Sequence, residues 1–439
     1  MSHKLEKIQY DAIRAAMGYR RSTPTNILLG ESKLITIRDR ARFLAENFII
    51  KVMSNSYLSI YKTILDYLSS EHRMAIRQDK LLLQSIRSLH ELIEEKLEQK
   101  ETFNLYAHEF KDLMTKIPVN INIGKMIQTS RCTQLLTDEL EKLWDSSYCL
   151  FTDGSKTQNG KSVGSGVICP QLKISEAKSI CPLASVYSAV CLALDDAMSF
   201  ALQYTDKDIH IFSDSLSVLQ ALENVNLSVT INNYICEIKR KYNFSSQAFP
   251  NRIIRFYWIP SHMGIQYNEE VDAIAKSATE NQVLNIKKIP FTDLRERSKK
   301  QAIESTTESI VEEGNYKGRE YFQLFYENGR KPWFKRFKKM ARNTIVWVNR
   351  ARSNHVNTAS SLHRINIVND PNCPCGLAVQ DLDHILWHCP KYRDHRIEMM
   401  QTVEKHVPLP TDINSILQTL KLPIIKAIDK FLKKCDLKI

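Results

Sequence analysis

Apolar positions in the first third of the chain follow the spacing of amphipathic helices. The periodicity returns over residues 37–70 and 80–99, and the turn-forming stretch RSTPTN at 21–26 interrupts it. This pattern predicts a mostly helical segment over residues 1–146. Near the N-terminus the apolar positions are Leu5, Ile8, Ala12, Ile13 and Ala16.

The hydrophobic pattern changes at Tyr148 from helical spacing to short apolar runs bounded by turn residues. Three predicted strands, followed by alternating helix and strand, are typical of a mixed α/β sheet. We therefore expect an α/β domain over residues 147–281, with a mixed five-stranded sheet flanked by helices, and a helical extension over 282–439. The expected strands begin at Tyr148 and cover 164–170, 173–182, 209–214 and 253–262, and the expected helices cover 185–203, 215–224 and 268–279.

The composition is that of a globular protein, with 43% hydrophobic and 25% charged residues. No apolar run approaches the roughly 18 residues that a membrane span needs. The first residues lack the apolar core of a signal peptide. The cysteines are scattered apart from one cluster at 373–389. These features predict an intracellular protein of the nucleus or cytoplasm, not secreted, with reduced thiols and no membrane partner.

The net charge of +12 lies almost entirely in the last third of the chain. Residues 281–439 carry 28 basic and 17 acidic side chains, whereas residues 147–280 carry 11 and 13. This asymmetry predicts a polyanionic partner, with nucleic acid as the first candidate and no small-molecule substrate. The alternative is a solvated basic surface that only favours solubility.

Basic and aromatic residues alternate in the segment RKPWFKRFKKMAR at 330–342. Basic side chains can neutralise phosphates, and an exposed ring can stack on a base. The alternative is an amphipathic helix that buries Trp333, Phe334 and Phe337 and exposes a solvated basic face. The candidate nucleic-acid-binding residues of this segment are Lys331, Lys335, Arg336, Lys338 and Lys339.

Acidic side chains follow two of the predicted strands. Asp153 closes the first strand in FTDGS, and Asp214 closes a later one in IFSDS. Asp272 lies in the first turns of the last predicted helix of the domain, ten residues after His262. Loops at the carboxyl ends of parallel strands are where α/β folds place active sites. Converging acids there can hold two divalent cations for phosphodiester hydrolysis, with Mg²⁺ or Mn²⁺ preferred by the oxygen ligands.

These motifs, in this order, resemble the type 1 ribonuclease H domain. The resemblance covers about 147–280 and rests on FTDGS, a strand hairpin, a helix that begins with YSA, IFSDS, WIPSHMGI and NEEVDAIAK. It implies that Asp153, Asp214 and Asp272 are metal-binding aspartates. His262 matches the mobile histidine that helps proton transfer and product release in this family.

The resemblance also implies a reaction, the hydrolysis of the RNA strand of an RNA–DNA hybrid. Recognition would come through 2′-hydroxyl and backbone contacts in the minor groove rather than through base sequence. Asn268 and Glu269 match the Asn-Glu pair that precedes the last aspartate in the family. Ser155 and Asn268 are the candidate nucleic-acid contacts of this domain.

The sequence departs from the family pattern at three positions. The fourth metal ligand of the family is a glutamate in a YSAE-like segment, and this chain has Val190 there. Asp195 and Asp196 lie roughly 7–9 Å further along the helix axis, so neither can readily replace it. Tyr267 replaces a usual glycine, and Val271 a usual alanine. Loss of one ligand predicts a catalytically impaired site.

Four residues between 373 and 389 form the inventory of a Cys₃His zinc site. They are Cys373, Cys375, His384 and Cys389, and His388 is an alternative ligand one helical turn after His384. Zinc is therefore a second candidate cofactor, which would stabilise a small domain. The alternative is a cluster of reduced, buried cysteines with a coincidental histidine.

The segments that flank the ribonuclease-like domain narrow the resemblance further. The stretch from LEKIQYDAIRAAMGYRR to NILLGES resembles the segment after the polymerase of insect-type non-LTR retrotransposons. The segments RKPWFKRFKKMARNTIVWVNRARSNH and CPCGLAVQDLDHILWHCPKY resemble the region after ribonuclease H in the same polyproteins. Three hypotheses follow: a hybrid-specific ribonuclease, a nucleic-acid-binding remnant with an inactive centre, and a relic without a selected role.

Overall fold

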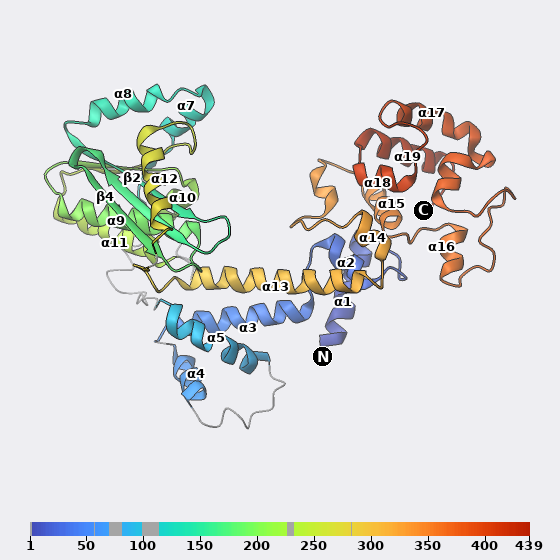
Figure 1. Ribbon diagram of the computed structural model, residues 1–439, viewed down its shortest axis with the longest axis horizontal. Coiled ribbons are helices and arrows are strands. Elements are labelled where there is room, and N and C mark those ends of the chain that lie inside the picture. Colours follow the sequence, from blue (N-terminus) through green and yellow to red (C-terminus); the bar gives the residue numbers. More distant parts are fainter. Residues whose placement is uncertain (1, 57, 70–80, 99–113, 226–231, 282) are drawn as a thin grey trace. The chain divides into compact units, whose positions relative to one another are not determined.

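The structure is a computed structural model that describes residues 2–56, 58–69, 81–98, 114–225, 232–281 and 283–439 (Figure 1). The chain forms two compact units. One comprises Arg42–Lys300, and the other joins Met1–Ala41 to Gln301–Ile439. These units differ from the three consecutive segments expected from the sequence, and each is described by itself below. None of the helices in the described ranges is both long and apolar enough to cross a membrane.

The unit Arg42–Lys300 contains one six-stranded sheet with the order β1-β6-β5-β2-β3-β4. β2, β3 and β4 pair in antiparallel fashion, whereas β2, β5, β6 and β1 pair in parallel. This confirms the mixed α/β fold with helical extensions. The two-residue strand β1 was not expected, because two residues are too few to produce a strand pattern. The strands are β1 (Val119–Asn120), β2 (Ser147–Lys156), β3 (Val163–Cys169), β4 (Ile174–Ile180), β5 (Asp208–Ser213) and β6 (Ile254–Trp258).

Helices cover both faces of this sheet. On one face, α9 and α11 pack over Tyr148 and Leu150 of β2, and on the other face α7, α8 and α12 pack over Cys149 and Phe151. This alternation follows from the period of two of a strand, because both faces of β2 are buried. The helices are α7 (Asn122–Ser130), α8 (Gln134–Leu143), α9 (Val186–Gln203), α10 (Leu216–Glu223), α11 (Asn233–Ala248) and α12 (Gln266–Ala278).

Three glycines let the helices approach the central strands closely. A Cβ on Gly154 of β2 would lie 2.6 Å from the backbone nitrogen of Val190 in α9. A Cβ on Gly164 of β3 would lie 2.3 Å from the carbonyl oxygen of Ala275 in α12, and one on Gly166 would lie 3.1 Å from that of Val271. Distances below 3.0 Å are not compatible with a side chain, so α9 and α12 press directly on backbone.

A third apolar cluster joins the sheet domain to helices that precede and follow it in sequence. Ile50, Leu89 and Phe291 pack there with Leu192 of α9. Asp293 accepts hydrogen bonds from the hydroxyls of Ser185 and Ser188 at 2.7 and 3.0 Å, which fixes the start of α9. The helices involved are α3 (Ile37–Met53), α4 (Ser59–Ser69), α5 (Leu81–Lys96) and the first turns of α13 (Phe291–Gly314).

The second unit is helical, and its N-terminal and C-terminal parts share one core. Glu31 of α2 and Arg352 of α15 form a buried ion pair of 2.8 Å. The side-chain amide of Asn349 donates to the carbonyl oxygen of Met17 at 2.9 Å. The helices are α1 (Ser2–Met17), α2 (Thr25–Ser32), α14 (Arg319–Leu324), α15 (Arg342–Arg352), α16 (Ala359–Arg364), α17 (Arg393–Glu404), α18 (Ile413–Thr419) and α19 (Leu422–Lys434).

The close approach at Gly154 generates a stability prediction. We expect Gly154→Ala to lower the free energy of unfolding by about 1–3 kcal/mol, because the new Cβ overlaps the backbone of α9. Urea unfolding followed by circular dichroism measures this change. Gly329→Ala is the matched control, because no atom lies within 4 Å of a Cβ built there. Equal stabilities of the two variants would contradict the prediction.

Candidate active site and Cys/His cluster

Asp153 lies inside β2, at the edge where the parallel strands end. β2 pairs in parallel with β5 as far as Thr152 and Ser213, so Asp153 and Asp214 follow in register. Asp153 is only 8% exposed, and the backbone N–H of Gly154 donates to its Oδ1 at 2.7 Å. The sheet therefore holds this carboxyl group in a nearly solvent-free position.

Asp214 follows β5 directly and is fixed by side chains from two other elements. Its backbone carbonyl accepts a hydrogen bond of 3.0 Å from the indole N–H of Trp258. Its carboxylate accepts a hydrogen bond from the side-chain amide of Asn268. Asn268 is buried, and within the described residues its Oδ1 has no donor. The site therefore contains one oriented aspartate and, beside it, one buried acceptor without a donor among the described residues.

Asp272 projects from α12 toward the same carboxyl groups. Its charge contributes to raising the pKa of Asp153, and Lys276, one turn later, donates to its Oδ2. Ligand atoms of His262, Glu269 and Asp272 all lie within 4.8 Å of one another. Glu269 was not expected among the ligands, although its i, i+3 spacing from Asp272 places both on one helix face.

His262 is exposed and has a backbone φ of 53°. Few residues other than glycine adopt this left-handed conformation, and such strain is concentrated at functional loops. The loop after β6 therefore holds an imidazole in an unusual backbone conformation beside the carboxyl cluster.

The three aspartates form a region of concentrated negative charge. Burial, and then the neighbouring Asp214 charge, raise the pKa of Asp153 to about 7, and the Gly154 N–H opposes this only in part. Burial also raises the pKa of Asp214, against the hydrogen bond from Asn268 and the charge of His262. Oxygen-rich donor sets of this kind suit hard divalent cations, whose charge would offset the repulsion. The residues present therefore fit Mg²⁺ or Mn²⁺.

Val190 occupies the helix position where the resemblance places a fourth carboxylate. It is 3% exposed and belongs to the apolar cluster between α9 and the sheet. The carboxylate of Asp195 accepts a hydrogen bond from Lys241 at 2.7 Å, and that of Asp196 accepts one from Lys178 at 2.5 Å. Asp195 and Asp196 are thus paired with lysines, and an aliphatic side chain occupies position 190, where the resemblance implies a glutamate.

The other two departures are also packing residues. The ring of Tyr267 lies 5.2 Å from that of Phe151 and 5.9 Å from that of Trp144, measured between centroids. Val271 is fully buried where α12 contacts the sheet. Ser155 is half-buried in β2 and, two residues after Asp153, projects to the same side of the strand.

The four expected zinc ligands lie together. Ligand atoms of Cys373, Cys375, His384 and Cys389 are all within 4.8 Å of one another, and the sulfur atoms of Cys373 and Cys389 are 3.8 Å apart. Zinc–sulfur bonds of about 2.3 Å in a tetrahedron place two sulfurs roughly 3.8 Å apart. The distance excludes a disulfide and fits a zinc ion. His388, the alternative ligand, is exposed and lies outside this cluster.

Local backbone structure explains why these four residues meet. Gly376, with a φ of 76°, allows the turn in which its N–H donates to the carbonyl oxygen of Cys373 at 2.9 Å. The buried guanidinium of Arg396 donates to the carbonyl oxygens of Leu386 and Cys389, which fixes the other half of the cluster.

The basic segment at 330–342 buries its rings rather than presenting them. Trp333 is buried and donates to Oδ1 of Asn349 at 2.9 Å, while Phe334 and Phe337 pack partly buried against the same core. The core therefore buries Trp333 and covers Phe334 and Phe337 in part, which favours the alternative of buried rings over stacking on bases. The element is a single 3-10 turn, η3 (Trp333–Arg336), and not an amphipathic helix. The candidate basic residues are exposed, namely Lys331, Lys335, Arg336, Lys338 and Lys339.

The described residues thus place three aspartates at one edge of a mixed α/β sheet. Residues 145–280 match the family model described as RNase H. No curated protein matches the chain. The match supports a ribonuclease H domain over these residues, with ribonuclease H-type nuclease function and binding of nucleic-acid hybrids. Members of this family generally use divalent metals such as Mg²⁺.

The charge concentration generates a prediction about stability and pH. Because the pKa of Asp153 is about 7 in the folded chain and 3.8 as its ordinary value, the folded state retains a proton that the unfolded state loses between these limits. The raised pKa of Asp153 therefore lowers the free energy of unfolding as the pH rises from about 4 to about 7. We expect Asp153→Asn to raise the melting temperature in buffer without divalent cations, with the advantage growing over that interval.

Thermal unfolding followed by fluorescence at several pH values measures this difference. Asp145→Asn, an exposed aspartate outside the cluster, is the control and should show no such trend. A melting temperature for Asp153→Asn that is equal to or below that of the unmodified chain across the interval would contradict the prediction.

Proposed function

We propose that this chain is a metal-dependent endonuclease that hydrolyses the RNA strand of RNA–DNA hybrids. The observation that carries this proposal is the convergence of Asp153, Asp214 and Asp272 inside a segment that matches the RNase H family model, where burial and the neighbouring carboxylate charges raise the pKa values of Asp153 and Asp214. These aspartates would hold a pair of Mg²⁺ or Mn²⁺ ions. When bound, such ions supply an activated water and stabilise the leaving oxygen of a phosphodiester.

The remaining side chains would orient the ligands, the substrate and a proton. Asn268 fixes the carboxylate of Asp214, and Lys276 fixes that of Asp272. His262, exposed beside Asp272, could accept a proton on its imidazole and release it to solvent. Ser155 and the free acceptor of Asn268 are the proposed contacts to the 2′-hydroxyls and backbone of the hybrid.

A second candidate function is that of a catalytically impaired nucleic-acid-binding protein. The observation that favours it is Val190, which fills the expected ligand position with a buried aliphatic side chain. An absent carboxylate removes one negative charge from the metal site. The same fold would then bind a hybrid without efficient cleavage.

We further propose that the chain derives from the C-terminal portion of a non-LTR retrotransposon polyprotein. The support is the resemblance of both flanking segments, and not only the central domain, to the regions around ribonuclease H in insect-type elements. The basic residues of η3 and its neighbours, Lys331 to Lys339, would then bind nucleic acid outside the nuclease site.

The Cys/His cluster is proposed as a structural zinc site. Its four ligands, Cys373, Cys375, His384 and Cys389, would tie a hairpin turn to the start of α17. Closed sites with four protein ligands contribute to folding rather than to catalysis. The unit that contains it would therefore depend on zinc for stability.

Cleavage of a labelled RNA–DNA hybrid with Mg²⁺ tests the two candidate functions. We expect slow cleavage by the unmodified chain, none by Asp153→Asn, and a rate higher by about 10²–10⁴ for Val190→Glu, because a restored ligand supplies ~2.7–5.4 kcal/mol of transition-state stabilisation. Val186→Glu, an exposed position on the same helix, is the matched control and should not change the rate.

The outcomes separate the candidates. Cleavage by the unmodified chain at the rate of Val190→Glu, abolished by Asp153→Asn, would exclude the impaired form. A rate no higher than that of Asp153→Asn would contradict the nuclease proposal. Hybrid binding measured in parallel shows whether affinity survives without turnover.

Metal analysis of the purified chain tests the zinc site. We expect one equivalent of zinc per chain, and its loss together with a lower melting temperature in Cys375→Ser, because a closed site needs all four ligands. Cys132→Ser, at an exposed cysteine outside the cluster, is the control. Full zinc content in Cys375→Ser would refute the assignment.

A further inference from the structure

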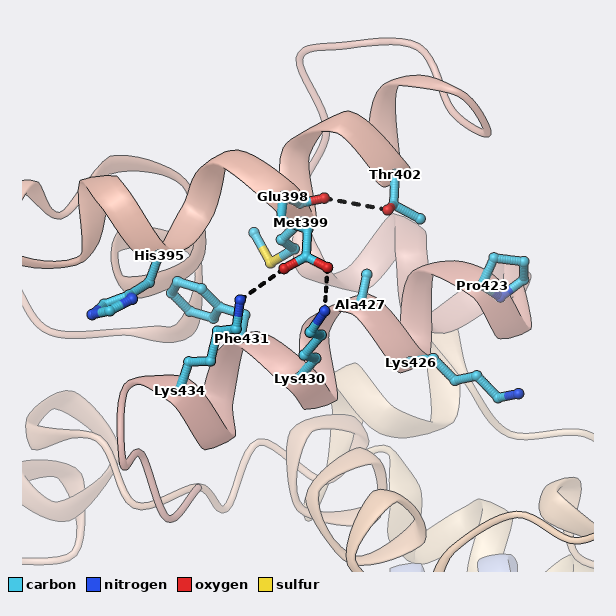
Figure 2. Close-up of a pocket in the computed structure, with 10 residues that line it drawn as sticks. All are labelled: His395, Glu398, Met399, Thr402, Pro423, Lys426, Ala427, Lys430, Phe431 and Lys434. Atoms are coloured by element: carbon cyan, nitrogen blue, oxygen red, sulfur yellow. Dashed lines mark hydrogen bonds and ion pairs between the residues drawn. The ribbon is translucent and has the colours of Figure 1, made fainter.

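A basic groove runs between α17 and α19 in the helical unit (Figure 2). Its volume is about 200 Å³, and it opens to solvent. A phosphate group with several waters fits this space, because each water takes roughly 30 Å³. The lining residues used below are His395, Glu398 and Met399 of α17, and Lys426, Lys430, Phe431 and Lys434 of α19.

Three lysines form a stripe along α19. Lys426, Lys430 and Lys434 stand at i, i+4 and i+8, so they share one helix face at steps of about 6 Å. The apolar floor beneath them is closed, since Met399 and Phe431 are buried in the core. The groove therefore exposes ammonium groups to solvent, with buried apolar side chains beneath them.

Glu398 holds two of these lysines in place. Its carboxylate oxygens accept hydrogen bonds from Lys430 and from Lys434, the latter at 2.8 Å (Figure 2). These contacts lower the pKa of Glu398 to about 2. Lys426 has no ion-pair or hydrogen-bond partner among the residues that the structure describes. Glu398 thus engages two of the three ammonium groups, and the groove keeps a positive excess.

We propose that this groove binds the phosphate backbone of a nucleic acid. Lys426 would contact phosphate first, and Lys430 and Lys434 would exchange Glu398 for further phosphates. The site goes beyond the proposed hydrolysis, because no lining residue belongs to the nuclease domain; the choice of nucleic acid among polyanions rests on the proposed function. Such contacts would be independent of base sequence and sensitive to salt.

The same residues argue against an anionic membrane as the partner. A helix that lies on a bilayer inserts an exposed apolar face. The apolar face of α19, with Ile424, Ile428 and Phe431, is instead buried within the helical unit. The lysines of the groove therefore lack the exposed apolar helix face that insertion into a bilayer requires, and they are suited to a soluble polyanion.

Binding of a short labelled DNA duplex by the full chain, without Mg²⁺ and at several salt concentrations, tests the proposal. We expect Lys426→Gln, Lys430→Gln and Lys434→Gln each to weaken binding about three- to fivefold at moderate salt and to lower the salt slope by roughly one. Lys433→Gln is the matched control, because Lys433 lies on the same helix outside the groove and pairs with Asp429.

A substitution that should tighten DNA binding complements the lysine variants, which should weaken it. Glu398→Gln releases Lys430 and Lys434 and should tighten DNA binding about threefold or more at low salt, whereas Glu404→Gln on the same helix should not. Lys430→Arg should retain affinity. Circular dichroism and melting temperatures show whether each variant folds. All the substituted positions are exposed at the surface.

Three results would overturn the proposal: groove variants no weaker than Lys433→Gln, no gain with Glu398→Gln, or a loss confined to vesicles of phosphatidylserine while DNA binding is unchanged. Duplex DNA is not a substrate of hybrid hydrolysis. If the chain cleaves hybrids but the groove variants bind DNA as well as the unmodified chain, only the groove proposal is refuted. If the chain does not cleave hybrids but the groove variants bind DNA more weakly, only the nuclease proposal is refuted.

Discussion

The close approach of α9 and α12 to the central strands is the constraint on which the nuclease domain depends. Gly154 and Gly164 leave no room for side chains and Gly166 leaves little, so both helices rest on backbone. This contact sets the depth of α12, and with it the position of Asp272 beside Asp153. The packing of the two helices against the sheet opposes the repulsion between the clustered carboxylates. A larger residue in the strands would prevent this close packing.

The same contact places the backbone of Val190 next to the first aspartate. The backbone nitrogen of Val190 lies against Gly154, next to Asp153, while the side chain belongs to the apolar core. A carboxylate at this position would replace an apolar side chain of the core, whereas valine preserves the packing. The later acids of α9 cannot compensate, because Lys241 and Lys178 engage Asp195 and Asp196.

Acidic and basic side chains are concentrated in different parts of the chain. Residues 147–280 are slightly acidic and include the three clustered aspartates, and the excess of positive charge lies in the C-terminal third. There the rings of the basic segment at 330–342 are used for packing, and exposed lysines remain for phosphates. The groove of α17 and α19 adds a second basic surface in which Glu398 pre-orients Lys430 and Lys434.

The sequence by itself determined five of the six strands, three of the helices of the sheet domain and the Cys/His inventory, because each depends on local periodicity or short spacing. It did not predict β1 (Val119–Asn120) or α11 (Asn233–Ala248). Tertiary structure alone decided that Met1–Ala41 joins Gln301–Ile439, through contacts such as Glu31 with Arg352. It also decided that His384 and not His388 joins the cysteines, that Trp333 is buried, and that α17 and α19 form a groove. These features depend on residues far apart in the chain, and hydrophobic periodicity carries no information about which distant faces meet.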